Sequence, residues 1–181
     1  PWEPLASGYV VYSLANRAVG GKPPTGAEAM ALTVGTQFPD LIDKPLGWGT
    51  SVLPSGISLA HSLLCAVPVS LTVIALARHA GVRKVGIAFA VGYFVHLPGD
   101  VVYPMALGGE PHLDFLLWPL LETSASPPAS ITGHVWHLLA QFFDLLATPT
   151  GRRYAVVELA VLATALGVWL LDGRPLFPER Q

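Results

Sequence analysis

The sequence predicts an all-α fold: a polytopic membrane helical bundle with about four to five membrane helices and re-entrant or interfacial segments, forming a single integral membrane domain over residues 1–181. Two observations predict this class. Of the 181 residues, 52% are hydrophobic and only 12% are charged, which is about half the charged share of a typical soluble domain. The apolar residues also gather into long runs, separated by clusters of proline and glycine. We therefore expect a multi-pass protein of the cell membrane, with membrane lipid as a partner.

The amino-terminal part alternates apolar segments with loops. Residues 5–19 are apolar but interrupted by polar side chains, so they form either a bundle-facing span or an interfacial helix. Glycine and proline predict loops over residues 20–26 and 45–56, because both residue types break helices. Residues 27–38, between these loops, are predicted to form a short helix.

The clearest predicted spans follow. Residues 57–77 contain no Asp, Glu, Lys or Arg and, at about 1.5 Å per residue, are about long enough to cross the hydrocarbon core. Residues 85–97 span only if their helix starts several residues earlier. Residues 113–121 are too short to cross and are predicted to be re-entrant or interfacial. The last predicted elements are a loop over residues 123–130 and a final span over residues 154–171.

Two histidines lie within predicted membrane segments. The basic loop 78–84 joins two neighbouring spans, and His61 and His96 lie about 26 Å and about 18 Å from it at 1.5 Å per residue. Both are expected near the membrane face away from that loop. Asp100 follows His96 by four residues, and the Pro-Gly pair between them is predicted to end the helix, so that the carboxylate folds back towards the imidazole. Polar groups inside a membrane are costly and usually face a bundle interior or a cavity, so we interpret both histidines as functional.

Asp40 and Asp43 form a second polar pair. Their spacing of three residues places both carboxylates on one side of a helical turn, which suits a bridged cation. Alternatively, they are solvated loop residues or a local helix cap. Together with His61, His96 and Asp100 they make a mixed nitrogen and oxygen donor set, which suits zinc, manganese or iron better than calcium. We predict a divalent metal site made of these five residues, with zinc or manganese as the favoured cofactor.

Other polar residues in apolar segments have alternative interpretations. His134, His137, Gln141 and Asp144 recur at steps of three, four and three, so they share one helical stripe. The favoured interpretation is an interfacial helix whose polar stripe contacts water. The alternative is a stripe that lines the site and supplies ligands or a proton relay. Glu158 is interpreted as a structural residue that reaches water or pairs with a nearby arginine.

Three motifs occur in order along the chain: Pro39-Asp40-Leu41-Ile42-Asp43, Ser58-Leu59-Ala60-His61-Ser62 and His96-Leu97-Pro98-Gly99-Asp100. With them, residues 2–121 resemble the YdjM-like family of predicted membrane-bound metal-dependent hydrolases, most closely its halophilic archaeal members. The resemblance implies a polytopic fold with a metal site of aspartates and histidines. Two positions depart from the family pattern: related sequences tend to carry a histidine where this chain has Pro4 and an arginine where it has Ile57.

Three functions are consistent with these residues. The first is a membrane-embedded metal-dependent hydrolase of a phosphoester or lipid-like substrate, in which the metal activates water and Lys44 and Ser62 contact the substrate; no catalytic residue is assigned. The second is a non-catalytic membrane subunit or scaffold that retains a degenerate metal site and binds a protein partner, which Pro4 and Ile57 favour. The third is a proton or ion pathway that uses His61, His96 and Glu158.

The charge pattern bears on partners and orientation. The net charge is −2 and there is no polybasic block, so nothing indicates a nucleic-acid partner. An excess of arginine and lysine marks cytoplasmic loops, and the clusters at residues 78–84 and 152–153 are the strongest in the chain. Both are expected to be cytoplasmic, which places the metal site near the outer membrane face.

Overall fold

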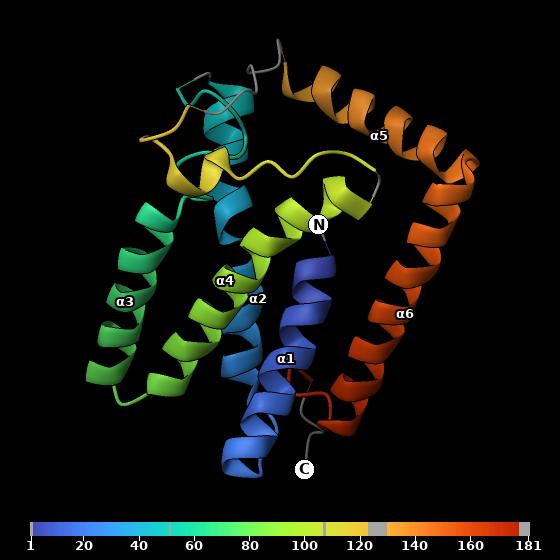
Figure 1. Ribbon diagram of the computed structural model, residues 1–181. Coiled ribbons are helices and arrows are strands. Elements are labelled where there is room, and N and C mark those ends of the chain that lie inside the picture. Colours follow the sequence, from blue (N-terminus) through green and yellow to red (C-terminus); the bar gives the residue numbers. More distant parts are fainter. Residues whose placement is uncertain (1, 51, 107, 123–129, 178–181) are drawn as a thin grey trace. The chain divides into compact units, whose positions relative to one another are not determined.

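The computed structural model describes residues 2–50, 52–106, 108–122 and 130–177, where all regular secondary structure is helical (Figure 1). The all-α prediction is confirmed for these residues. The elements in chain order are α1 (Glu3–Gly20), α2 (Gly26–Lys44), the π-helix η1 (Pro45–Gly49), α3 (Leu63–His79), α4 (Arg83–Ala106), the 3-10 turn η2 (Asp114–Leu117), α5 (Ile131–Ala147) and α6 (Pro149–Leu171).

The chain divides into two compact units, and several helices contribute residues to both. Unit 1 contains Pro1–Gln37, Val67–Gly99 and Leu159–Gln181, and unit 2 contains Phe38–Ala66 and Asp100–Glu158. The boundary falls within two residues of a proline in three of the shared helices, at Pro39 in α2, Pro68 in α3 and Pro98 in α4. A single domain over the whole chain stays a prediction.

In the described part of the chain, two helices are long and apolar enough to cross a membrane, namely α4 and α6, while α3 is apolar but shorter. The four to five spans that the sequence predicts are therefore not all found. The difference is largest at residues 57–77, because α3 begins only at Leu63. Residues 58–62 form turns instead, and their backbone N–H groups bond to a side chain of α2.

Two predicted helix ends are wrong. Helix α2 continues past residue 38 and through Pro39 to Lys44, and η1 follows directly where a loop over 45–56 was expected. Helix α4 continues through Pro98 and Gly99 to Ala106. Membrane helices tolerate proline and glycine where neighbouring groups satisfy the freed carbonyls. As a result, His96 and Asp100 lie one turn apart on the same face of α4.

The remaining connections differ in how closely they follow the predictions. The loop between α1 and α2 is present, with Gly21 in the left-handed conformation at φ +66°. Residues 113–121 contain only the single turn η2 followed by non-helical turns, so they do not cross a membrane. Most of the loop predicted at 123–130 lies outside the described residues.

Unit 1 is held together by a close crossing of α2 and α4. A Cβ added to Gly35 would lie 2.1 Å from the carbonyl oxygen of Phe89, and one added to Gly92 would lie 2.3 Å from that of Leu32. Only glycine allows the two backbones to approach this closely. Small residues at helix crossings are typical of membrane proteins, where van der Waals packing between helices drives association.

Unit 1 also contains a buried polar group that we call the Asp172 cluster. The Asp172 side chain is fully buried and accepts hydrogen bonds from Tyr9 Oη at 2.8 Å, Ser13 Oγ at 2.6 Å and Arg17 Nε at 3.0 Å. The three donors are spaced by four residues, which places them on one face of α1. The cluster therefore fastens the end of α6 to α1.

Unit 2 joins η1, α5 and the start of α6. The ring of Trp48 in η1 makes a T-shaped contact with His134 in α5, with centroids 4.5 Å apart. Thr148 is extended, at φ −85° and ψ 154°, so the chain changes direction between α5 and α6 (Figure 1). Tyr103 in α4 contacts Tyr154 in α6 in the same manner, at 5.6 Å.

Candidate metal site

His61 is the centre of the predicted site. Its side chain is fully buried, and it lies in the turns that precede α3. The Nδ1 atom is 2.8 Å from Asp43 Oδ2. Asp43, in the last turn of α2, is also fully buried and accepts from the backbone N–H groups of Ser58 at 2.8 Å, Ala60 at 2.9 Å and His61 at 3.2 Å. One carboxylate therefore fixes both the irregular segment and the orientation of the ring.

The opposite nitrogen of His61 faces two further carboxylates. His61 Nε2 is 3.4 Å from Asp40 Oδ1 and 3.2 Å from Asp100 Oδ2. Asp40 lies one turn before Asp43 on α2, as the predicted spacing requires, and Asp100 comes from α4. The side chains of Asp40 and Asp100 are 14% and 31% exposed, so this side of the ring is the more accessible one. Asp40, Asp43, His61 and Asp100 all belong to unit 2.

The three carboxylates change the acidity of the ring. Burial by itself lowers the pKa of His61, but hydrogen bonds with Asp100, Asp40 and Asp43 outweigh it and raise the pKa from 6.5 to about 10. Without a metal, the cluster therefore holds a protonated imidazole near neutral pH. A positive charge at this position is strongly stabilised, which is the condition that a cation site must meet.

The spacing of the donor atoms fits a divalent metal. A tetrahedral zinc ion with bonds of about 2.0–2.1 Å separates its ligand atoms by about 3.3 Å. His61 Nε2 lies 3.4 Å from Asp40 Oδ1 and 3.2 Å from Asp100 Oδ2, so both separations are close to the value for zinc. The nitrogen and oxygen donors are of the kind that zinc and manganese accept. The contact of His61 Nδ1 with Asp43 also fits a metal site, because a metal-bound histidine usually donates its other N–H to a carboxylate.

His96 also offers a ligand atom of the right kind, like Asp40 and His61. It is 2% exposed and lies one turn before Asp100 on the same face of α4. It belongs to unit 1, whereas Asp100 is the first residue of the α4 part of unit 2. The sequence predicted that Asp100 folds back towards His96 after the end of the helix. Instead, the helix continues and the two residues lie one turn apart on it.

The two predicted substrate contacts make bonds within the protein. Lys44 pairs with Asp40 Oδ2, and its Nζ lies 5.5 Å from the ring centroid of Trp48. Ser62 Oγ donates to the carbonyl of Trp118 at 2.7 Å and accepts from the N–H of Leu64 at 3.1 Å. Ser62 thereby caps the start of α3 and holds the segment after η2. Contact of either residue with a substrate stays a prediction.

Sequence reasoning missed the aromatic residues around the cluster. Phe115 of η2 is 1% exposed and makes a T-shaped contact with His61, with centroids 6.2 Å apart. It lies in a generally apolar stretch, so no pattern singles it out. Trp48 is held against Lys44 and also against Gly56, where an added Cβ would lie 2.3 Å from Trp48 Nε1. A tryptophan in a presumed loop gave no signal of this contact.

The polar stripe of α5 remains open to both interpretations. His137, Gln141 and Asp144 are exposed, and His134 packs against Trp48. Among the described residues, neither histidine of the stripe joins the group of metal-ligating side chains. The interfacial role of the helix stays a prediction.

Comparison with known proteins extends the family relation along the chain. The family described as YdjM inner membrane protein matches residues 5–175, well beyond residue 121, where the similarity seen in the sequence ended. No curated protein and no solved structure matches the chain. Because the match covers nearly the whole sequence, the chain belongs to the YdjM family of inner membrane proteins.

Proposed function

We propose that this protein is a membrane-embedded metal-dependent hydrolase whose substrate is a phosphoester or a lipid-like ester. The observation that carries the proposal is the position of Asp40 and Asp100, whose oxygens lie at metal-ligand separations from His61 Nε2. Asp40, His61 and Asp100 are the proposed ligands, and His96 adds a second imidazole from α4. Zinc is the favoured metal, with manganese next.

The remaining residues of the site have supporting roles in this proposal. A bound divalent cation supplies Lewis-acid activation of water near neutral pH. Asp43 is a positioning residue instead of a ligand, because its oxygens are taken by backbone N–H groups and by His61 Nδ1. Lys44 places an ammonium group beside Asp40, where it can bind a phosphate oxygen. Phe115 covers one side of the imidazole and keeps water from that side.

Metal content and turnover test the proposal. Protein purified in detergent, stripped with a chelator and reloaded with zinc or manganese, is given bis-p-nitrophenyl phosphate or phosphatidylglycerol in mixed micelles. We expect the wild type to retain metal and hydrolyse one of them, and His61→Ala to lose both properties. Asp144→Asn, an exposed aspartate on α5, is the control and should behave as the wild type. A wild-type protein that binds neither metal would overturn the proposal.

The scaffold alternative is favoured by one contact. Pro4 lies against Gly99, the residue before Asp100: its Cγ would be 3.1 Å from a Cβ on that glycine. A position at which related sequences tend to carry histidine therefore adjoins the α4 side of the site, and proline cannot ligate a metal. Metal retention without turnover would support the scaffold. A proton or ion pathway would instead need no stoichiometric metal.

We propose in addition that the site lies near the outer membrane face. The support is the basic turn between α3 and α4, because Arg83 and Lys84 begin α4 and Arg78 lies in the last turn of α3. Single cysteines at Val82→Cys in this turn and Val52→Cys near the site, both at exposed positions, are introduced in a Cys65→Ser background. An impermeant thiol reagent applied to intact cells should label position 52 only. Labelling of position 82 only would put the site on the cytoplasmic side.

A further inference from the structure

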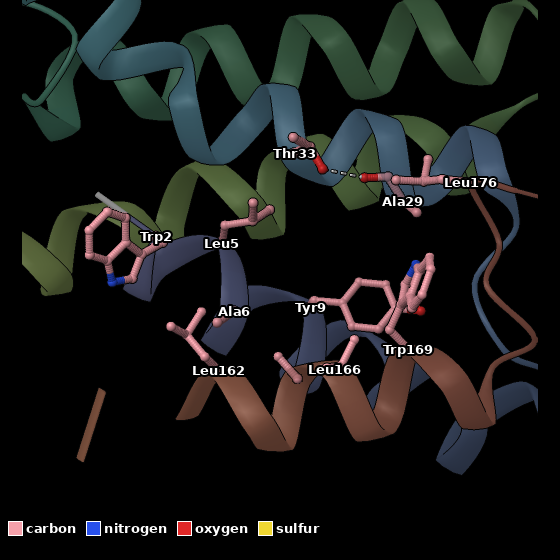
Figure 2. Close-up of a pocket in the computed structure, with 11 residues that line it drawn as sticks. Trp2, Leu5, Ala6, Tyr9, Ala29, Thr33, Leu162, Leu166, Trp169 and Leu176 are labelled. Atoms are coloured by element: carbon pink, nitrogen blue, oxygen red, sulfur yellow. Dashed lines mark hydrogen bonds between the residues drawn. The ribbon is translucent and has the colours of Figure 1, made fainter. Parts of the chain in front are cut away.

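Unit 1 contains a pocket of about 250 Å³ that the metal site does not use (Figure 2). Side chains spaced by one helical turn line it from three helices. Leu5, Ala6 and Tyr9 come from α1, Ala29 and Thr33 from α2, and the α6 wall includes Leu162, Ala165, Leu166 and Trp169.

The polar atoms of this wall are largely satisfied within the protein. Tyr9 Oη donates to Asp172 at 2.8 Å, and Thr33 Oγ1 donates to the carbonyl of Ala29 at 3.0 Å. Neither hydroxyl therefore has a proton left to donate to a ligand. Apart from these hydroxyls, the Tyr9 ring and two indoles, the lining side chains are aliphatic. The pocket therefore selects hydrocarbon and provides little for a charged or sugar-like group.

The α6 wall of the pocket lies on a helix suited to contact with lipid. Helix α6 is long and apolar enough to cross a membrane, and none of its most apolar stretch is buried inside the protein. Leu166 in the wall is 56% exposed. In a bilayer, such a helix is surrounded by acyl chains, which can enter the pocket sideways without passing through water.

We infer that this pocket binds one acyl chain of a membrane lipid. Pockets that enclose a whole small-molecule ligand measure about 300–1,000 Å³, so about 250 Å³ accommodates one chain and leaves the headgroup outside. The apolar lining favours contact with hydrocarbon over contact with water. Trp2 and Trp169 lie at opposite ends of the lining in Figure 2, and indole rings are favoured where acyl chains meet headgroups. This lipid site is independent of the proposed hydrolase.

A pair of alanines on α6 allows a matched test. Ala165 lines the pocket, whereas Ala163, two residues earlier, is exposed and does not. Ala165→Phe fills the pocket with a ring, and Ala163→Phe adds the same ring to the outer surface. Each protein is purified in a maltoside detergent, incubated with phosphatidylglycerol and examined by native mass spectrometry. The mass of the adduct also distinguishes a phospholipid from a free fatty acid.

We expect the wild type and Ala163→Phe to retain a single lipid. Ala165→Phe should bind it about tenfold more weakly or worse, because losing the burial of two methylene groups already costs that much. Thermal unfolding of the same samples should show stabilisation by the lipid in the first two proteins only. Far-ultraviolet circular dichroism of all three proteins without added lipid monitors folding and should be unchanged. Equal lipid retention by the two phenylalanine variants, or loss from both, would overturn the inference.

Discussion

The two units each contain a buried polar cluster, and the clusters differ in charge balance. In the Asp172 cluster of unit 1, one carboxylate faces one guanidinium and two hydroxyls, all from α1. In the His61 cluster of unit 2, three carboxylates face one imidazole, and Lys44 binds one of them. In the first cluster, the charges of the carboxylate and the guanidinium cancel. The second has an excess of negative charge around a buried nitrogen, and two of its carboxylates are partly exposed.

The difference is the one expected between a structural cluster and the proposed metal site. A fastener between helices is complete when every donor has an acceptor and the charges cancel. A cation site in the absence of its cation must have the opposite property, an excess of acceptors held in place by other bonds. Asp43 provides that support in unit 2, where it leaves Asp40 and Asp100 to face the same nitrogen.

The largest expected effect is a loss of stability when the Asp172 cluster is broken. Asp172→Ala leaves Tyr9, Ser13 and Arg17 without their common acceptor. Breaking a buried ion pair costs about 3–5 kcal/mol, and the 40% exposure of the Arg17 side chain places this variant at about 3 kcal/mol. The melting temperature in detergent should fall by about 6–12 °C.

Zinc affinity provides the contrast for this variant, because Asp172 lies in the unit without Asp40, His61 and Asp100. We expect it to be unchanged at a temperature where the protein is folded. Asp144→Ala is the exposed control and should change stability by about 0.5 kcal/mol or less. Loss of zinc binding with an unchanged melting temperature would reverse the roles assigned to the two clusters.

A smaller effect on metal binding is expected from changing Asp43, which positions His61 in the His61 cluster. Asp43→Asn keeps the size of the side chain, but its amide group cannot accept from all the N–H groups that now bond to Asp43. Removing an outer partner of a metal-bound histidine weakens metal binding about 10–100-fold. Zinc affinity measured by competition with a chelator checks this. A loss as complete as that of His61→Ala would instead identify Asp43 as a direct ligand.

A third expected effect is a graded dependence of zinc affinity on pH. The pKa of His61 is raised to about 10, so metal must displace a proton from the ring. Zinc affinity should therefore rise about tenfold per pH unit between about pH 7 and 9 and level off above the pKa.

The metal-free protein should show the opposite trend in stability. A raised pKa means that protonated His61 stabilises the folded state fully below about pH 6.5, and that this stabilisation is lost as the pH approaches 10. Thermal unfolding with and without zinc measures both trends. His61→Ala should remove the pH-dependent part of the metal-free stability, and an unchanged slope in that variant would assign the proton to another group.

Much of the helical architecture was predictable because it depends on the distribution of apolar residues. The final span, the loop after α1 and the one-turn spacing of Asp40 and Asp43 follow from composition and helical period. The continuation of α4 through Pro98 and Gly99 could not be predicted in this way. Whether a helix tolerates a proline depends on neighbouring groups that a local sequence pattern does not contain. The same holds for α3, whose start is set by bonds to Asp43.

The site was predictable in residue type but not in role. Histidines and aspartates in apolar segments point to function because burying them is costly. That Asp43 supports and Asp40 faces the open side could not be predicted, since the partners of Asp43 are backbone N–H groups that any residue can supply. For the Asp172 cluster, the sequence shows that Tyr9, Ser13 and Arg17 are spaced by four residues. Their common acceptor, however, lies 155 residues beyond Arg17.

The bonds of Asp43 also have a consequence for the order in which the protein folds. Asp43 and His61 are 18 residues apart, and the length-dependent part of the chain-entropy cost of closing such a loop is about 2.6 kcal/mol. Hydrogen bonds to Ser58, Ala60 and His61 offset this cost during folding, once the last turn of α2 has formed. If the proposed metal site binds a cation, the cation therefore meets a ring that is already in place. Its binding rate is then governed by access to Asp40 and Asp100, with no rearrangement of the chain to wait for.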